Sequence, residues 1–109
     1  PPIGAIMSKE LEVKRCLVCS TAHMTFDDNT VLGLYGCRIT PHVNWVLEYE
    51  YGFIIDLWGG RVAVLRLKRM GLSKTLRKFV YQMMTKYDIK MIQFDCDGGV
   101  ISGMPVCNW

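Results

Sequence analysis

Residues 73–95, SKTLRKFVYQMMTKYDIKMIQFD, join an amphipathic helix to a β-strand. Ser73 is a favourable N-cap. After it, apolar residues recur at i, i+3, i+4, i+7, i+8 and i+11, the spacing of one helical face. These residues are Leu76, Phe79, Val80, Met83, Met84 and Tyr87. From Ile89 to Asp95 the side chains alternate between two faces, which is typical of a strand. The stretch predicts a helix packed against a sheet.

The preceding residues predict more strands and a second helix. Residues 13–19 indicate a short strand. Thr25, with Asp28 three residues later, fits a capping box and predicts a helix to about Leu34. Residues 43–50 and 53–58 indicate two further strands. The pair Gly59-Gly60 is a hairpin signal, and we expect residues 61–68 to return as a third strand with Ala63, Leu65 and Leu67 on one face.

This order of elements predicts an α+β fold. We expect a single-layer mixed β-sheet of four or five strands with two helices packed on one face. The strands at 13–19 and 89–95 should be central. Residues 1–6 are expected to be a tag or a disordered leader, and residues 7–109 a single globular domain.

Composition and cysteine content limit the compartment and the chemistry. No apolar run approaches the ~20 residues that span a bilayer, so we expect no membrane partner. Five cysteines without a disulfide-framework spacing favour reduced thiols and a cytoplasmic location. No nucleophile elbow, phosphate loop or paired-acid signature is present, so we expect no enzyme activity and no cofactor.

Eight of the thirteen basic residues lie between Arg61 and Lys86, a stretch without a single Asp or Glu. Exposed helices usually carry both signs of charge, so this segregation is consistent either with a binding surface, the hypothesis we follow, or with a solvated helix face. The residues assigned to this basic face are Arg61, Arg66, Lys68, Arg69, Lys74, Arg77 and Lys78. Acidic protein surfaces and nucleic-acid phosphates would both bind such a face. Apart from Trp58 and Tyr81, the segment lacks the aromatics on which single strands stack, and it matches no DNA-reading motif.

Cys16-x-x-Cys19-x-x-x-His23 resembles a metal-binding spacing. On a strand, however, residues three apart point to opposite faces. Cys16 and Cys19 are therefore expected to be structural thiols that bind no metal.

Polar residues gather where two predicted strands end. Ser20, Thr21 and His23 follow the first strand, and Asp95 and Asp97 follow the strand at 89–95. If these strands are parallel neighbours, the five residues share one rim, where ligand clefts occur in open sheets. A His near carboxylates would suit a general base. The simpler interpretation, which we prefer, is that these residues cap helices and close turns.

Three segments carry a resemblance to a known family. They are Cys19-Ser20-Thr21-Ala22-His23-Met24 with Asp28, then Tyr49-Glu50-Tyr51-Gly52-Phe53 with Ile54-Ile55, and finally Phe94-Asp95-Cys96-Asp97-Gly98-Gly99 with Met104-Pro105 and Trp109. Together they resemble a domain-of-unknown-function family of small bacterial proteins found on plasmids, prophages and other mobile elements. The resemblance covers most of residues 16–109 and implies a small cytosolic α+β domain of mobile-element origin. It transfers no activity.

We therefore predict a non-enzymatic accessory protein of a mobile genetic element that binds a protein partner. Nucleic-acid binding through residues 61–86 is the alternative, and a small enzyme or ligand binder at the His23/Asp95 rim is a third. A flat sheet face carrying Trp45, Tyr49 and Tyr51 further predicts a homodimer.

Overall fold

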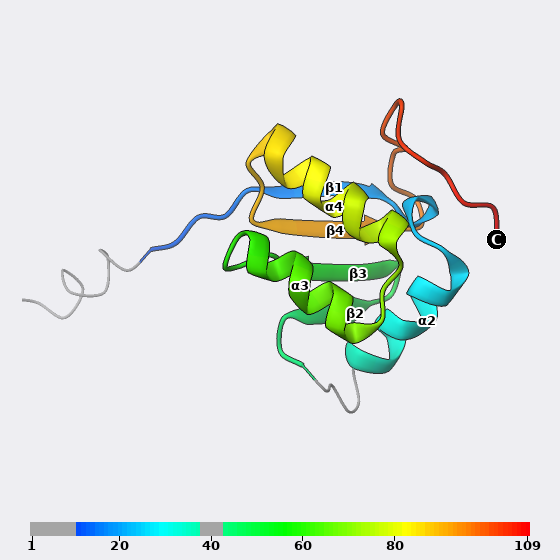
Figure 1. The fold of residues 1–109 in the computed structure, drawn as a ribbon, viewed down its shortest axis with the longest axis horizontal. Coiled ribbons are helices and arrows are strands. Elements are labelled where there is room, and N and C mark those ends of the chain that lie inside the picture. Colours follow the sequence, from blue (N-terminus) through cyan, green and yellow to red (C-terminus); the bar gives the residue numbers. More distant parts are fainter. Residues whose placement is uncertain (1–10, 38–42) are drawn as a thin grey trace, which may run out of the picture.

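A computed structural model describes residues 11–37 and 43–109 of the chain. The predicted leader at residues 1–6 lies outside the described residues. The elements in chain order are β1 (Cys16–Ser20), the short 3-10 helix η1 (Thr21–His23), α2 (Phe26–Tyr35), β2 (Val46–Tyr49), β3 (Gly52–Asp56), α3 (Arg61–Met70), α4 (Lys74–Tyr87) and β4 (Met91–Asp95). The fold is therefore α+β, as the sequence predicted (Figure 1).

The four strands form one mixed sheet in the order β1-β4-β3-β2. β1 and β4 are parallel, with Ser20 opposite Asp95, and the other two pairs are antiparallel. β4 is a central strand, as predicted. The expectation that the first strand is also central is wrong, because the sheet ends at β1.

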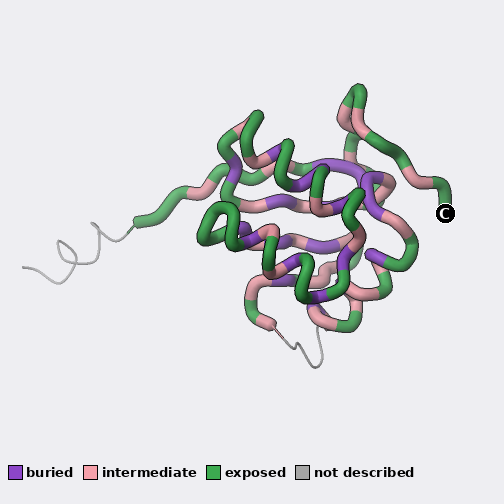
Figure 2. The backbone as a smooth tube through the Cα atoms, viewed as in Figure 1, coloured by how far each residue is buried: buried purple, intermediate pink, exposed green. Residues whose placement is uncertain are grey.

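The helices pack on one face of the sheet, where they enclose the core. α3 and α4 cross the sheet side by side in Figure 1, and Leu32 of α2 joins the same core as Val46 of β2. Buried residues alternate along the strands, with Phe53 and Ile55 on β3 and further inward residues on β4 (Figure 2). Two helices were predicted on this face, and α3 is the third.

α3 replaces the strand predicted for residues 61–68. Ala63, Leu67 and Met70 are its buried residues, and their spacing of four and three is that of a helix facing the core. Gly60, with φ 60°, precedes the helix instead of forming a hairpin turn, and Gly71, with φ 96°, ends it in the left-handed region that favours glycine. Leu65, predicted to share a face with Ala63, points outward instead and is 52% exposed.

A buried carboxylate joins the beginnings of α2 and α4. Asp28 is 2% exposed and forms the predicted capping box with Thr25 at the start of α2. Its carboxylate also accepts hydrogen bonds from the main-chain N–H and the hydroxyl of Ser73, at 2.7 and 2.6 Å. Ser73 Oγ in turn accepts from the Leu76 N–H and caps α4 as predicted. Asp28 thereby fixes where α4 begins relative to α2.

Candidate functional site

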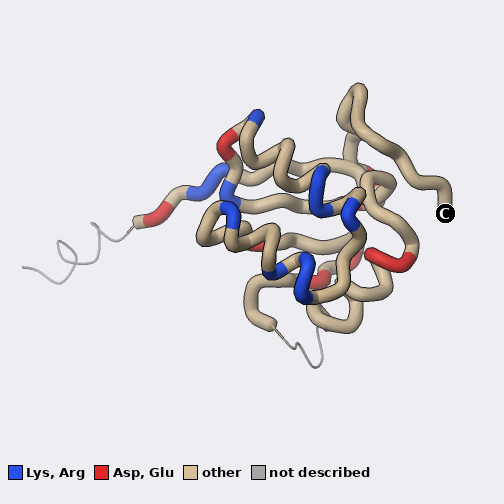
Figure 3. Tube along the Cα trace, viewed as in Figure 1, with Lys and Arg blue, Asp and Glu red and all other residues tan. Residues whose placement is uncertain are grey.

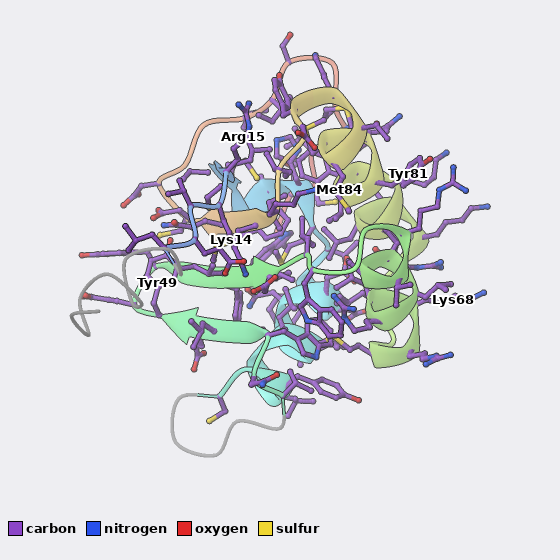
Figure 4. All side chains as sticks on the ribbon, turned by 90° about the vertical axis from the view of Figure 1, so that its left-hand side faces the viewer. Lys14, Arg15, Tyr49, Lys68, Tyr81 and Met84 are labelled. Carbon is purple, nitrogen blue, oxygen red and sulfur yellow. The ribbon has the colours of Figure 1, made fainter. Side chains whose placement is uncertain are left out.

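The basic residues lie on the two helices that cover the sheet. Figure 3 shows the Lys and Arg positions of α3 and α4 gathered on this side, and Figure 4 shows the Lys68 and Tyr81 side chains pointing away from the sheet. Five of the seven residues assigned to the basic face are exposed: Arg61, Lys68, Arg69, Lys74 and Lys78. A helix–loop–helix unit thus collects on one surface the charges that the sequence placed in one segment.

Two members of the predicted set are partly engaged within the fold. The Arg66 guanidinium lies 4.0 Å from the centre of the Trp58 ring and 5.3 Å from that of Trp45, and it donates a hydrogen bond to the Trp58 carbonyl oxygen. Its Nε and Nη1 are buried without a hydrogen-bond partner, and burial lowers the pKa of Arg66. Arg77 is half-buried and donates from Nε to the Leu72 carbonyl oxygen at 3.2 Å. Arg66 therefore anchors the stretch before α3, and Arg77 braces the loop between the helices.

The positive charge of this surface is not neutralised by carboxylates. Within the described residues, the ion pairs involve only Lys14 and Lys90, with Glu12, Asp56 and Asp88 as their partners. The first turn of α4 contains no acidic residue, although it begins with Lys74. Cations near a helix N-terminus are unfavourable for the helix dipole. This arrangement therefore does not favour the stability of α4.

A shallow apolar cleft lies between the two helices, and Arg61 is the one cation among its lining residues. It has a volume of about 400 Å³ and is lined by Arg61, Val64, Leu65 and Tyr81. Val62 beside it is 51% exposed. Sequence reasoning missed Val64 and Leu65 as surface residues because it assigned them to a strand. The helical spacing of Ala63, Leu67 and Met70 is the signal that could have found them.

The predicted rim exists, but its residues are joined to the protein itself. β1 and β4 end together, with Ser20 opposite Asp95. The Ser20 hydroxyl accepts from the Ala22 N–H and caps η1. Asp95 accepts from Tyr49 Oη and from the Asp97 main-chain N–H, each at 2.7 Å. These two hydrogen bonds hold the pKa of Asp95 below its ordinary value.

His23 is fully buried and does not face Asp95. Its Nε2 accepts from the Ile101 N–H at 2.9 Å, so Nδ1 carries the proton and donates to the Pro105 carbonyl oxygen at 2.8 Å. The ring stacks on Phe79 with centroids 4.4 Å apart. Both nitrogens therefore hold the C-terminal segment against η1 and α4. Thr21, another residue of the predicted rim, lines a cleft of about 300 Å³ together with Tyr51 and Trp109. Neither His23 nor Asp95 lines this cleft.

The cysteines of the Cys16-x-x-Cys19-x-x-x-His23 pattern are not brought together. Cys16 is exposed at the start of β1, whereas Cys19 is buried in the core on the helix side. Burial raises the pKa of the Cys19 thiol to about 12, which leaves it protonated and unreactive. Among the described residues, the one group whose ligand atoms lie close enough for an ion is Asp95, Cys96 and Asp97, in a single turn. Both Asp95 oxygens already accept hydrogen bonds there. The prediction that Cys16 and Cys19 bind no metal stays a prediction.

The fold and this surface define a small α+β domain with one sheet layer, one helix layer and an unneutralised basic helical face. The chain belongs to a family of unknown function, DUF5983, whose C-terminal domain model matches residues 16–109. That match begins at the first residue of β1. Comparison with curated proteins and with solved structures gave no match. None of the helices in the described residues is long and apolar enough to cross a membrane.

Proposed function

We propose that this domain is a non-enzymatic accessory protein that binds a partner protein through its α3/α4 face. The observation that carries the proposal is the apolar cleft at Leu65 and Tyr81, which Arg61 also lines, on a helical face whose exposed cations form no ion pair with a carboxylate in the described residues. Such a surface fits a partner segment that carries both acidic and apolar side chains, since each part of the surface then meets its complement.

The cleft favours protein over nucleic acid. A phosphate backbone needs only cations, whereas burying Val64 and Leu65 requires an apolar group on the partner. Nucleic-acid binding by residues 61–86 remains the second candidate because the face is rich in cations and includes the exposed Tyr81 ring, on which a base could stack.

The enzyme alternative at the His23/Asp95 rim has less support. A general base needs a free nitrogen within reach of a substrate, and both nitrogens of His23 are used by main-chain groups. Origin from a plasmid, prophage or other mobile element, and action in the cytoplasm, belong to the same proposal. They are supported by the Ser20-Thr21-Ala22-His23 and Asp95-to-Trp109 segments described above.

A charge-reversal experiment tests the binding face. The variant Lys68→Glu/Lys78→Glu reverses two exposed cations of this face, and Arg15→Glu/Lys90→Glu makes the same change in net charge outside residues 61–86. Partners are captured from nuclease-treated and untreated host lysate, identified, purified and titrated. Two exposed pairs at about 0.5–1 kcal/mol each predict roughly 5- to 30-fold weaker binding for the first variant. The control variant should bind like the parent.

A Leu65→Ser variant separates the two classes of partner. It should weaken the binding of a protein partner, which is also captured from nuclease-treated lysate. It should leave the binding of nucleic-acid phosphates unchanged. Nucleic acid would instead show log affinity falling with log salt at about −0.9 per phosphate contact. Equal binding by both charge-reversal variants would show that the basic face is exposed to solvent and binds no partner.

A further inference from the structure

A second cleft opens at the end of the sheet where β1 and β4 finish. Its volume is about 300 Å³, and residues of η1, α2, the β2–β3 turn and the C-terminal segment line it. Gly52 at the start of β3 pairs with Asp95 at the end of β4, so the β2–β3 turn lies at this same end (Figure 1). Of the predicted rim residues, only Thr21 is among the described residues that line it. We call this space the hairpin cleft.

Aromatic rings form much of the lining of the hairpin cleft. The rings belong to Tyr49, Tyr51, Phe53 and Trp109. Phe53 is buried, whereas Tyr51 and Trp109 are 48% and 53% exposed. Large rings left half exposed around a concave site are typical of a place where a ligand binds.

The rings are held in place by the fold. Trp109 Nε1 donates to the Met24 carbonyl oxygen at 2.8 Å. The Tyr51 carbonyl oxygen accepts from the Cys96 main-chain N–H at 2.8 Å, which fixes the β2–β3 turn against the end of β4. The Tyr51 ring also meets the Tyr49 ring edge-on, with centroids 6.3 Å apart. A site whose walls are already placed loses little conformational entropy when a ligand binds.

The hairpin cleft is also acidic. Glu48 and Glu50 line it, and no lysine or arginine is among its described lining residues. Glu48 lies opposite Phe53 in the β2–β3 ladder, so its side chain is on the helix side of the sheet, where it is half-buried. Within residues 11–37 and 43–109, neither carboxylate takes part in an ion pair. The cleft is therefore complementary to a positively charged group.

We infer that the hairpin cleft binds a guanidinium group. This group uses both features of the lining, because its flat face stacks on aromatic rings and its N–H groups donate in pairs to a carboxylate. A quaternary ammonium ion has no N–H to donate and would use the rings alone. The chain itself contains the stacking contact elsewhere, since the Arg66 guanidinium lies 4.0 Å from the centre of the Trp58 ring.

A guanidinium group can reach the cleft as an arginine side chain of another protein or as part of a small free molecule. Both sources present the same chemistry to the rings and carboxylates. The inference does not rest on the proposed function, because no residue of α3 or α4 is among the described residues that line the hairpin cleft. Failure of one therefore leaves the other standing.

The aromatic residues of the predicted dimer surface separate in the structure. Tyr49 and Tyr51 line the hairpin cleft. Trp45 instead packs against the core, and the Arg66 guanidinium lies 5.3 Å from the centre of its ring. The homodimer itself stays a prediction.

NMR titration of the unaltered protein with small probes tests the inference. Ethylguanidinium should shift the Trp109 indole N–H and the Tyr51 ring signals to saturation, with a Kd of about 1 mM, while the Trp58 indole signal stays constant. Ethylurea has the same planar shape without the charge and should not bind. Tetramethylammonium should bind at least about fivefold more weakly, because it cannot donate to the carboxylates. Tighter binding of an arginine tripeptide with blocked ends would assign the ligand to a polypeptide, and equal binding to a small molecule.

Two substitutions test the two features separately. Glu48→Gln and Tyr51→Leu should each raise the Kd of ethylguanidinium roughly twofold to fivefold, and the double variant roughly tenfold. Glu12→Gln and Tyr81→Leu are the matched controls, since they make the same chemical changes at exposed residues that do not line the cleft. Both should leave the Kd unchanged.

The absence of a saturable shift up to about 100 mM ethylguanidinium, roughly a hundred times the expected Kd, would overturn the inference. Equal binding of ethylurea would do the same, because the charge would then not be recognised. So would control variants that weaken binding as much as Glu48→Gln and Tyr51→Leu do. Tetramethylammonium bound as tightly as ethylguanidinium, with no effect of Glu48→Gln, would show a site for quaternary ammonium instead.

Discussion

Asp28 offers the sharpest test of what holds the helix layer together. Its carboxylate is 2% exposed and accepts hydrogen bonds from the Thr25 N–H, the Ser73 N–H and the Ser73 hydroxyl. The substitution Asp28→Ala removes both acceptor oxygens and all three hydrogen bonds at once. It leaves two partly buried main-chain donors, the N–H groups of Thr25 and Ser73, unpaired at the beginnings of α2 and α4.

The expected cost follows from these contacts. A hydrogen bond to a charged group contributes roughly 1.5–3 kcal/mol, but three that share one carboxylate are not additive. We expect Asp28→Ala to lower the free energy of unfolding by about 3–4 kcal/mol, a large fraction of the ~5–15 kcal/mol of a typical domain. Asp28→Asn keeps the shape and one acceptor oxygen, and should cost about half as much.

Urea denaturation followed by circular dichroism measures these changes. Asp27→Ala is the matched control, because Asp27 lies in the same first turn of α2 but is exposed. It should cost less than about 1 kcal/mol through the helix dipole alone. If Asp28→Ala costs no more than Asp27→Ala, the link between α2 and α4 does not stabilise the fold and the reasoning is refuted.

Substitutions at two further residues test single contacts. Tyr49→Phe should raise the pKa of Asp95, whose folded-state pKa is depressed chiefly by the Tyr49 hydrogen bond. That bond contributes stability above the unfolded pKa, which is lost as pH falls below about 4, so the variant should lose less stability on acidification. Carboxyl NMR titration showing an unchanged pKa would contradict this. Arg66→Ala should lower stability by about 1 kcal/mol and change Trp58 fluorescence. Arg66→Met keeps the packing against the Trp rings without the two buried unpaired nitrogens, so it should lower stability less than Arg66→Ala does. An equal loss of stability in both variants would refute the argument that Arg66 acts through packing.

Local sequence signals predicted most of the secondary structure. The helix over 74–87, the capping box at Thr25 and Asp28, and the strand ending at Asp95 agree with the structure because each depends on side chains within a few residues. The prediction of a strand at residues 61–68 was wrong because, in so short a run, the spacing of Ala63 and Leu67 fits both a strand and a helix. Packing against α4 favours the helical conformation of residues 61–70. This contact is tertiary, so the local sequence pattern does not reveal it.

For the site, the sequence by itself determined the charge segregation, since the absence of Asp and Glu from residues 61–86 needs no coordinates. It also predicted the shared rim of Ser20 and Asp95, because parallel strands end at one edge. Only the tertiary structure decided that Leu65 faces outward, that Arg66 turns onto Trp58, and that His23 holds the C-terminal segment. Composition and periodicity describe what each side chain is and which neighbours precede and follow it. Which partners it meets across the sheet depends on contacts between residues far apart in the chain, and these exist only once the helices and strands have packed.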